Sequence, residues 1–95
     1  MVYVDPISTW PTAIRCFKAG SCHLVADTVE ELHAFARLLG LRRGWFQPVS
    51  WPHYDLTPAR REKAVALGAV QKTSRELAVM RIAFRAAQRT DKEGP

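Results

Sequence analysis

The chain of 95 residues is 47% hydrophobic and carries a formal net charge of +5. This length and composition exclude a disordered chain and predict one folded domain over residues 1–95. Its two cysteines, Cys16 and Cys22, are too few for a disulfide framework, and no apolar run reaches the roughly 18 residues of a membrane span. The first residues also lack the pattern of a signal peptide. We therefore expect a cytoplasmic protein with reduced thiols and no membrane contact.

The first part of the chain predicts two strands joined by a long loop. Residues 2–5 (VYVD) and 22–27 (CHLVAD) are short runs rich in β-forming residues, and each run ends on an aspartate. Residues 6–21 lie between them and contain two prolines and a glycine, which favour a loop. Within this loop, Trp10 and Phe17 are expected to pack onto the core.

A helix is predicted over residues 28–39. Thr28 and Glu31 are spaced as a capping box at its start, apolar residues then recur at helical spacing, and Gly40 is a suitable end. The stretch 41–52 that follows is rich in turn-forming residues.

The second half predicts two further strands, each followed by a helix. Strands are expected at 53–56 and 69–72, and helices at 58–67 and 73–89. This alternation predicts an α/β fold with a small, mostly parallel sheet of three to four short strands, flanked by three helices. The expected core consists of Leu24, Val25, Leu32, Phe35, Leu39, Leu67, Leu77, Met80 and Phe84.

Three aspartates stand at the predicted strand ends. Asp5, Asp27 and Asp55 would converge at one edge of the sheet if their strands were parallel neighbours, because ligand sites in such sheets lie outside the carboxyl ends of the strands. Converging carboxylates favour a bound cation, and oxygen ligands indicate Mg²⁺ or Mn²⁺. A local interpretation stays open, in which Asp27 caps the following helix and Asp55 forms a turn before Thr57.

Histidines accompany these aspartates. His23 and His53 lie close to predicted strand ends and are candidate general bases, so we predict a catalytic group of His23, His53 and Asp55. Because side chains alternate along a strand, His53 and Asp55 should share one face, while Tyr54 should point to the other face and pack beneath a helix. No spacing of these residues matches a known zinc motif. The candidate ligand-binding residues are Asp5, Asp27, Glu31, His33 and Tyr54.

The excess positive charge lies entirely in the C-terminal 38 residues, which hold nine basic and four acidic residues. Two clusters suggest contact with phosphate groups of a nucleic acid. The first comprises Arg60, Arg61 and Lys63, and the second recurs every four residues at Arg81, Arg85 and Arg89. A charged stripe opposite an apolar one is also typical of the solvated face of a helix, so both interpretations stay open.

Four stretches carry a resemblance to a known family: VYVDPISTWP, CHLVADTVEELHAFARLLGL, PHYDLT and GAVQKTSREL. In these stretches the chain resembles the small bacterial and phage proteins collected as domain of unknown function 4031. The resemblance covers about residues 2–80 and leaves a frayed, basic end at 81–95, which holds the arginine stripe. It implies that the candidate Asp, His, Glu and Tyr residues coincide with the family pattern, but it implies no activity.

These observations lead to three functional hypotheses. The first is a polar pocket at the strand ends that binds a phosphate-bearing ligand, either a nucleotide or a nucleic acid, with or without a divalent metal. The second is a metal-dependent hydrolase of phosphoesters, with the three aspartates as metal ligands and His23 or His53 as the base. The third is a structural or partner-binding module without catalysis. The sequence does not predict the oligomeric state.

Overall fold

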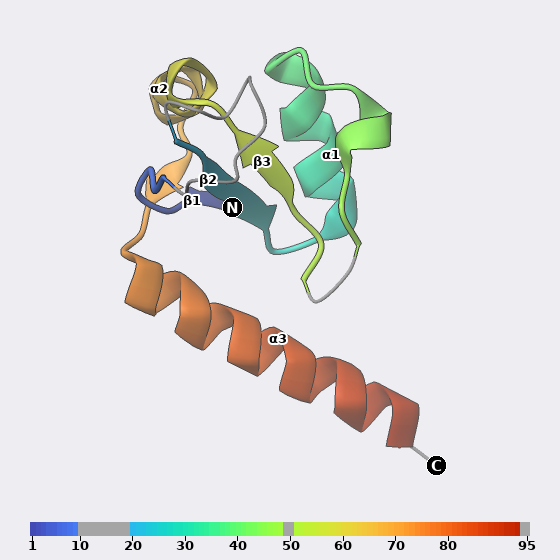
Figure 1. Ribbon diagram of the computed structural model, residues 1–95. Coiled ribbons are helices and arrows are strands. Elements are labelled where there is room, and N and C mark those ends of the chain that lie inside the picture. Colours follow the sequence, from blue (N-terminus) through green and yellow to red (C-terminus); the bar gives the residue numbers. More distant parts are fainter. Residues whose placement is uncertain (10–19, 49–50, 94–95) are drawn as a thin grey trace.

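The computed structural model describes residues 1–9, 20–48 and 51–93, with residues 88–93 described by their backbone alone. The described residues form a four-stranded sheet in the order β3-β2-β1-β4, three α-helices and one 3-10 turn, η2 (Figure 1). Their bounds are β1 Val2–Val4, β2 Cys22–Ala26, α1 Val29–Leu38, η2 Arg43–Trp45, β3 Tyr54–Leu56, α2 Pro58–Ala66, β4 Val70–Gln71 and α3 Ser74–Glu93.

The predicted α/β class is confirmed, but the sheet is mixed rather than mostly parallel. Strand β2 runs antiparallel to both of its neighbours, β1 and β3, and only β4 is parallel to β1. The physical reason lies in the loop after β1, whose two ends pair with each other through an antiparallel bridge between Ser8 and Ser21. The chain therefore folds back on itself as in a hairpin, whereas a parallel connection requires a crossover, usually helical.

Side-chain alternation gives the sheet two different faces. Val4, Leu24 and Leu56 point to the face covered by α1 and α2, where the main hydrophobic core lies. The next residues along the strands, including Tyr3 and Val25, point to the face on which α3 lies (Figure 1). The sheet therefore separates a closed core from a second, smaller layer.

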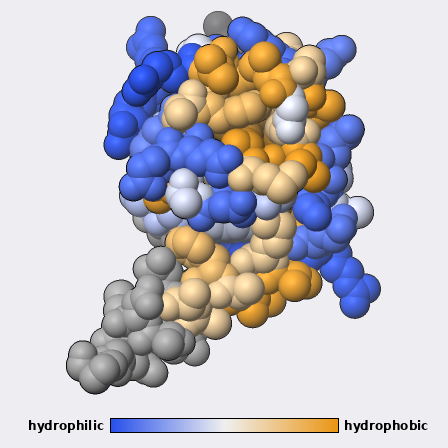
Figure 2. All heavy atoms as spheres, turned by 180° about the vertical axis from the view of Figure 1, so that it is seen from behind, coloured by the Kyte–Doolittle hydropathy of each residue, from blue (hydrophilic) through white to orange (hydrophobic). Residues whose placement is uncertain are grey.

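Helix α3 packs on this second layer mainly through the first half of its length. Leu77 is buried against Val25 and Trp51, and two further α3 residues, Met80 and Phe84, pack on them partly buried. Other apolar α3 side chains, such as Val79 and Ile82, are exposed, and Figure 2 shows apolar surface along this helix. The helix then continues away from the sheet toward the C-terminus (Figure 1).

The expected core is largely correct, with one error at the end of α2. Leu24, Val25, Leu32, Leu39 and Leu77 are buried, and Phe35, Met80 and Phe84 are partly buried in the packed clusters. Leu67, however, is 47% exposed, because α2 ends just before it and turns Ala64 toward the sheet instead. The small Ala64 lets this helix approach the strands closely.

The predicted helix starts are also confirmed. The Thr28 hydroxyl accepts from the backbone N–H of Glu31, and Thr57 accepts from the N–H of Arg60. Thr73 and Glu76 form a reciprocal capping box, with distances of 2.9 and 3.0 Å. These caps fix where each helix leaves the sheet, and α3 in particular begins beside the site described below.

Two expectations concern residues outside this description, since Trp10, Cys16 and Phe17 do not lie among the described residues. Cys22 is a buried free thiol, and burial raises its pKa to about 12. Its side chain is therefore an inert, neutral part of the core. No helix among the residues described has the length and hydrophobicity needed to cross a membrane.

Candidate metal centre and ligand pocket

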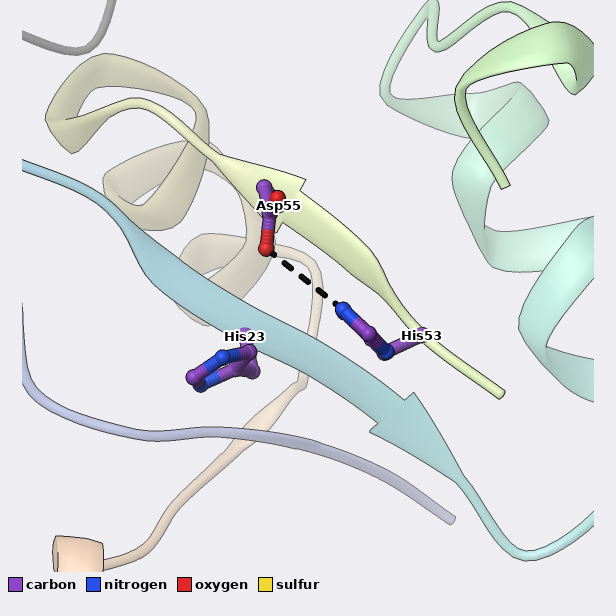
Figure 3. A group of neighbouring side chains, drawn as sticks. All are labelled: His23, His53 and Asp55. Atoms are coloured by element: carbon purple, nitrogen blue, oxygen red, sulfur yellow. Dashed lines mark ion pairs between the residues drawn. The ribbon is translucent and has the colours of Figure 1, made fainter. Parts of the chain in front are cut away.

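The strand alternation that builds the core also gathers polar side chains on the α3 side of the sheet. His23 lies between the buried Cys22 and Leu24, so it projects from the opposite face of β2. Its register partner on β3 is Asp55, and His53 lies two residues before Asp55. Figure 3 shows these three side chains, His23, His53 and Asp55, grouped on one side of the two strands.

Asp5 orients the His23 ring. One carboxylate oxygen accepts from the backbone N–H of His23 at 2.7 Å, and the other lies 2.8 Å from the ring Nδ1. Asp5 is almost fully buried, and Arg61 holds its backbone by donating from Nε to the Asp5 carbonyl at 2.8 Å. Because the ionised carboxylate can only accept, Nδ1 carries the proton and Nε2 presents its lone pair.

The same contact sets the protonation of both groups. Burial alone would raise the pKa of Asp5, but the hydrogen bonds from His23 outweigh it and lower that pKa. The hydrogen bond to Asp5 raises the pKa of His23, against the opposing effects of desolvation and of the Arg81 guanidinium. The pair therefore favours an ionised Asp5 and a basic His23 imidazole.

A backbone carbonyl orients His53 in a similar way. Its Nδ1 lies 2.6 Å from the Trp51 carbonyl oxygen, which can only accept, so Nδ1 is again the protonated nitrogen. The remaining nitrogen, Nε2, lies 3.7 Å from Oδ1 of Asp55. The rings of His53 and His23 meet edge to face, with centroids 5.3 Å apart. His53 thus presents Nε2 to the Asp55 carboxylate, with the His23 ring beside it.

Asp55 is itself held by a neighbouring loop. Gln47 donates from Nε2 to Oδ2 of Asp55 at 2.6 Å, and the Gln47 backbone pairs with that of His53. One oxygen of Asp55 is therefore fixed by the amide, and the other, Oδ1, faces the His53 ring. Each residue of this cluster has one side-chain atom engaged in orientation and another available to a ligand.

The three side chains form a group that could hold a divalent metal ion. His23, His53 and Asp55 each offer one ligand atom, and these atoms lie within 4.8 Å of one another. Two ligands of a zinc ion are at most about 4 Å apart, twice the bond length of roughly 2.0–2.2 Å. The three atoms thus lie somewhat farther apart than the ligands of a bound zinc ion, and side-chain rotation would have to bring them together. We refer to these three residues as the His–Asp cluster.

A pocket of about 290 Å³ opens beside the His–Asp cluster, between the sheet and the first half of α3. The sheet side contributes both histidines of the cluster, and the helix side contributes a basic residue, Arg81. The lining residues are Asp5, Ser8, His23, Val25, Trp51, His53, Ser74, Leu77, Ala78 and Arg81. The pocket thus places an arginine across from two potential metal ligands.

The predicted convergence of three aspartates is wrong for Asp27. Because β2 is antiparallel to its neighbours, its carboxyl end and Asp27 lie at the opposite end of the strands from Asp5. There Asp27 accepts from the Met1 amino group at 2.7 Å and from the Tyr3 hydroxyl at 2.9 Å. Glu31 accepts from the same amino group. Asp27 and Glu31 therefore lie apart from the His–Asp cluster.

His33 and Tyr54 also lie away from the pocket. Tyr54 points into the main core, as the alternation predicts, and its hydroxyl lies 2.9 Å from Nδ1 of His33. The His33 ring also packs edge to face on Phe46 at 4.5 Å, and desolvation lowers its pKa. This pair joins α1 to β3 beneath the helix and has the features of a core contact.

The candidate arginines do not share one surface. Arg60 lies over the Trp45 ring at 5.4 Å, whereas Arg61 supports Asp5 and reaches Gln71. Arg81 lines the pocket, while Arg85, one turn later on α3, does not line it. The last candidate, Arg89, lies outside the residues whose side chains are described. The arginine stripe predicted from the sequence is therefore not one surface, because Arg81 faces the pocket and Arg85 does not.

Sequence reasoning missed the residues that orient the cluster. Gln47 and the Trp51 carbonyl come from the turn-rich stretch before β3, and no local pattern marks them as partners of Asp55 and His53. Asp5 was expected as a metal ligand, but both of its oxygens contact His23. The sequence did indicate one thing about Asp5. Strand alternation places its side chain on the same face of the sheet as that of Tyr3, two residues earlier.

The fold and the cluster define the chain as a small mixed α/β domain with a His/Asp site between its sheet and its last helix. A family model described as "Protein of unknown function (DUF4031)" matches residues 2–84, and the chain belongs to this family. The matched range contains the whole His–Asp cluster and extends to include Arg81. No curated protein and no solved structure matches the chain.

Proposed function

We propose that the pocket binds a phosphate-bearing ligand at a divalent metal ion held by His23, His53 and Asp55. The observation that carries the proposal is the orientation of the two imidazoles. Each has its Nδ1 engaged by a hydrogen-bond acceptor, a carboxylate for His23 and a carbonyl for His53, which leaves Nε2 of each ring as the nitrogen available to a metal. Metal-binding histidines are held in this way, because the second acceptor fixes the tautomer and increases the basicity of the ligand nitrogen.

The donor set favours a transition metal. Mg²⁺ prefers oxygen ligands in octahedral geometry, whereas two imidazole nitrogens with one carboxylate suit Zn²⁺ or a similar first-row ion. The Mg²⁺ or Mn²⁺ suggested by three converging aspartates thus gives way to Zn²⁺ as the preferred candidate, since only Asp55 of the three belongs to the cluster. Three protein ligands also leave a coordination position open on a four-coordinate ion.

The surroundings of the open position favour an anion. Arg81 lines the pocket across from His23 and His53 and provides a positive charge beside the ion. A phosphoryl oxygen is an anionic donor that can coordinate the metal while its other oxygens accept hydrogen bonds from a guanidinium. A phosphate group can therefore coordinate the metal ion on the sheet side of the pocket and accept hydrogen bonds from Arg81 on the helix side.

Calorimetric titration with Zn²⁺, followed by inorganic phosphate, tests this function. The wild type should bind one Zn²⁺ and should bind phosphate only after Zn²⁺ is loaded. His53→Ala and Asp55→Asn should weaken Zn²⁺ binding by about tenfold or more, since each removes one of three ligands. Asp27→Asn is the matched control, because Asp27 is an exposed carboxylate at the other end of the strands. Equal Zn²⁺ affinity in Asp55→Asn and Asp27→Asn would contradict the proposal.

A second candidate function, phosphoester hydrolysis, is favoured by the same open position. Catalytic zinc sites keep a water there, whose pKa falls to about 7. In such a reaction the water oxygen bonds to phosphorus, the ester P–O bond breaks, and the released alcohol takes up the proton. Incubation of the Zn²⁺-loaded protein with p-nitrophenyl phosphate tests this candidate. Release of nitrophenol by the wild type and not by Asp55→Asn supports hydrolysis, and Zn²⁺ and phosphate binding without turnover supports a binding domain.

The third hypothesis, a structural module, predicts a different outcome. If the His–Asp cluster only stabilises the fold, the wild type should bind neither Zn²⁺ nor phosphate, and His53→Ala and Asp55→Asn should lower the melting temperature clearly. Thermal melts of the titrated samples therefore separate a structural role from a site.

A further inference from the structure

We infer that the ligand of this pocket is a small phosphate monoester, whose terminal phosphate lies between the metal-binding His–Asp cluster and Arg81. The inference rests on the proposed function and specifies its substrate class. It excludes the alternative that the pocket holds an internal phosphodiester of a nucleic acid strand.

The first argument is the position of Arg81. Ser74, Leu77, Ala78 and Arg81 follow one another at helical spacing, so one face of α3 forms the wall opposite the histidines. Among the described residues, no carboxylate lies within ion-pairing distance of Arg81. Its planar guanidinium is therefore available for a phosphate, whose geometry it matches with two parallel hydrogen bonds.

The second argument is the charge balance of the loaded site. The negative charges of Asp5 and Asp55 offset the two positive charges of a divalent ion. Arg81 in the pocket wall then leaves one positive charge, and Arg61, which lies outside the lining and is hydrogen-bonded to the Asp5 backbone, adds a second one nearby. A phosphate monoester carries roughly −1.5 to −2 at neutral pH. A phosphodiester carries only about −1. The monoester therefore neutralises the site more completely.

The third argument is the size and lining of the pocket. Its volume of about 290 Å³ is at the lower end of small-molecule sites, which span roughly 300–1,000 Å³. Binding of a nucleic acid strand normally uses an open basic groove with aromatic side chains on which bases stack. Trp51, the large aromatic side chain in the lining, is only 7% exposed and packs against Leu77 and Phe84. It presents no free face to a row of bases.

The experiment compares 5′-AMP with 3′,5′-cyclic AMP, which share base and sugar but differ in the phosphate, on the Zn²⁺-loaded protein. Calorimetry should show that AMP binds at least about tenfold more tightly, because it brings an additional negative charge to the ion. Arg81→Ala should weaken AMP binding by about tenfold to a hundredfold, the effect of losing a charged hydrogen-bonding partner. Arg85→Ala, the matched control, should change it by less than about twofold, because exposed charges outside the pocket are screened.

The outcomes separate this inference from the function on which it rests. Equal binding of AMP and cyclic AMP, or of an unphosphorylated hexathymidylate, would overturn the monoester while leaving metal-dependent phosphate binding intact. An equal loss in Arg81→Ala and Arg85→Ala would indicate general attraction by the basic helix and would also overturn it. Absence of Zn²⁺ binding and of inorganic phosphate binding in the wild type would instead remove the proposed function itself.

Discussion

The same strands present mainly apolar, buried side chains on one face of the sheet and polar, partly exposed side chains on the other. On the face toward α1 and α2, Leu24 and Leu56 are completely buried, and the buried Tyr54 hydroxyl is paired with the partly buried His33. On the face toward α3, neighbouring residues of the same strands, His23 and Asp55, are polar and partly exposed. A strand that alternates between these faces therefore supplies the core with one residue and the site with the next.

The two histidines on these faces illustrate the difference. His33 has a neutral partner, the Tyr54 hydroxyl, and desolvation lowers its pKa. His23 has a carboxylate partner, Asp5, which raises its pKa, and its side chain is 53% exposed. The partner on the ring nitrogen, rather than the histidine itself, distinguishes a core contact from a candidate metal ligand.

The largest expected difference between the faces is in stability. Leu24→Ala should lower the free energy of unfolding by about 2–5 kcal/mol, because it leaves a cavity in a fully buried position. Asp55→Asn, on the adjacent strand but on the other face, should change it by less than about 1 kcal/mol, as is usual for a partly exposed polar position. Urea unfolding followed by tryptophan fluorescence measures both. Similar losses in the two variants would mean that the polar face is part of the structural core.

The next effect concerns Asp5, which we interpret as a positioning residue for His23. Asp5→Asn keeps a similar volume but removes the negative charge that fixes the His23 tautomer, so Zn²⁺ affinity should fall by about tenfold to a hundredfold. Competition with a chromophoric chelator measures this affinity, and Asp5→Glu should restore part of it. If Asp5→Asn bound Zn²⁺ as tightly as the wild type, the orientation of His23 by Asp5 would have no role in metal binding.

A smaller effect is expected in the pH dependence of stability of the metal-free protein. The lowered pKa of Asp5 stabilises the fold above the ordinary value of 3.8, and this contribution is lost as the pH falls through the lowered pKa. The raised pKa of His23 stabilises the fold below the ordinary value of 6.5, and this contribution is lost as the pH rises through the raised pKa.

The contribution of the Asp5–His23 pair should therefore be complete between about pH 3.8 and 6.5 and should decrease on both sides. Urea titrations of wild type and Asp5→Asn at several pH values measure it as the difference between the two proteins. A difference that stays constant from pH 3 to pH 9 would show that the pair does not change its protonation on folding.

The smallest effect is expected at Leu67, which the helical pattern wrongly placed in the core. Because Leu67 is 47% exposed after the end of α2, Leu67→Ser should change the free energy of unfolding by no more than about 0.5 kcal/mol. Chemical denaturation of this variant beside Leu24→Ala gives a direct comparison. A loss as large as that of Leu24→Ala would restore the core position predicted from the sequence.

Local rules predicted most elements of this fold. The threonine caps at 28, 57 and 73 and the alternation through His53-Tyr54-Asp55 depend on neighbours in the sequence, and they were predicted correctly. The direction of β2 was not, because it depends on pairing between the distant Ser8 and Ser21. The direction of β2 decides which aspartates lie close together, and it places Asp27 at the opposite end of the strands from Asp5.

The candidate site shows the same limit. His23, His53 and Asp55 were chosen from their places on strands, whereas the contacts that orient them span long distances in sequence or come from an irregular loop. Arg81 and Arg85 are equivalent in the sequence pattern, and only the packing of α3 on the sheet places the first of them in the pocket. Tertiary contacts therefore select the functional residues from a set that local patterns had proposed.

A crystal structure of the Zn²⁺-loaded protein, with the ion located by its anomalous scattering, tests the central claim most directly. The account predicts one strong peak between Nε2 of His23, Nε2 of His53 and a carboxylate oxygen of Asp55, with bonds of about 2.0–2.2 Å. Absence of a peak at these three residues, or a peak at Asp27 and Glu31 instead, would contradict it.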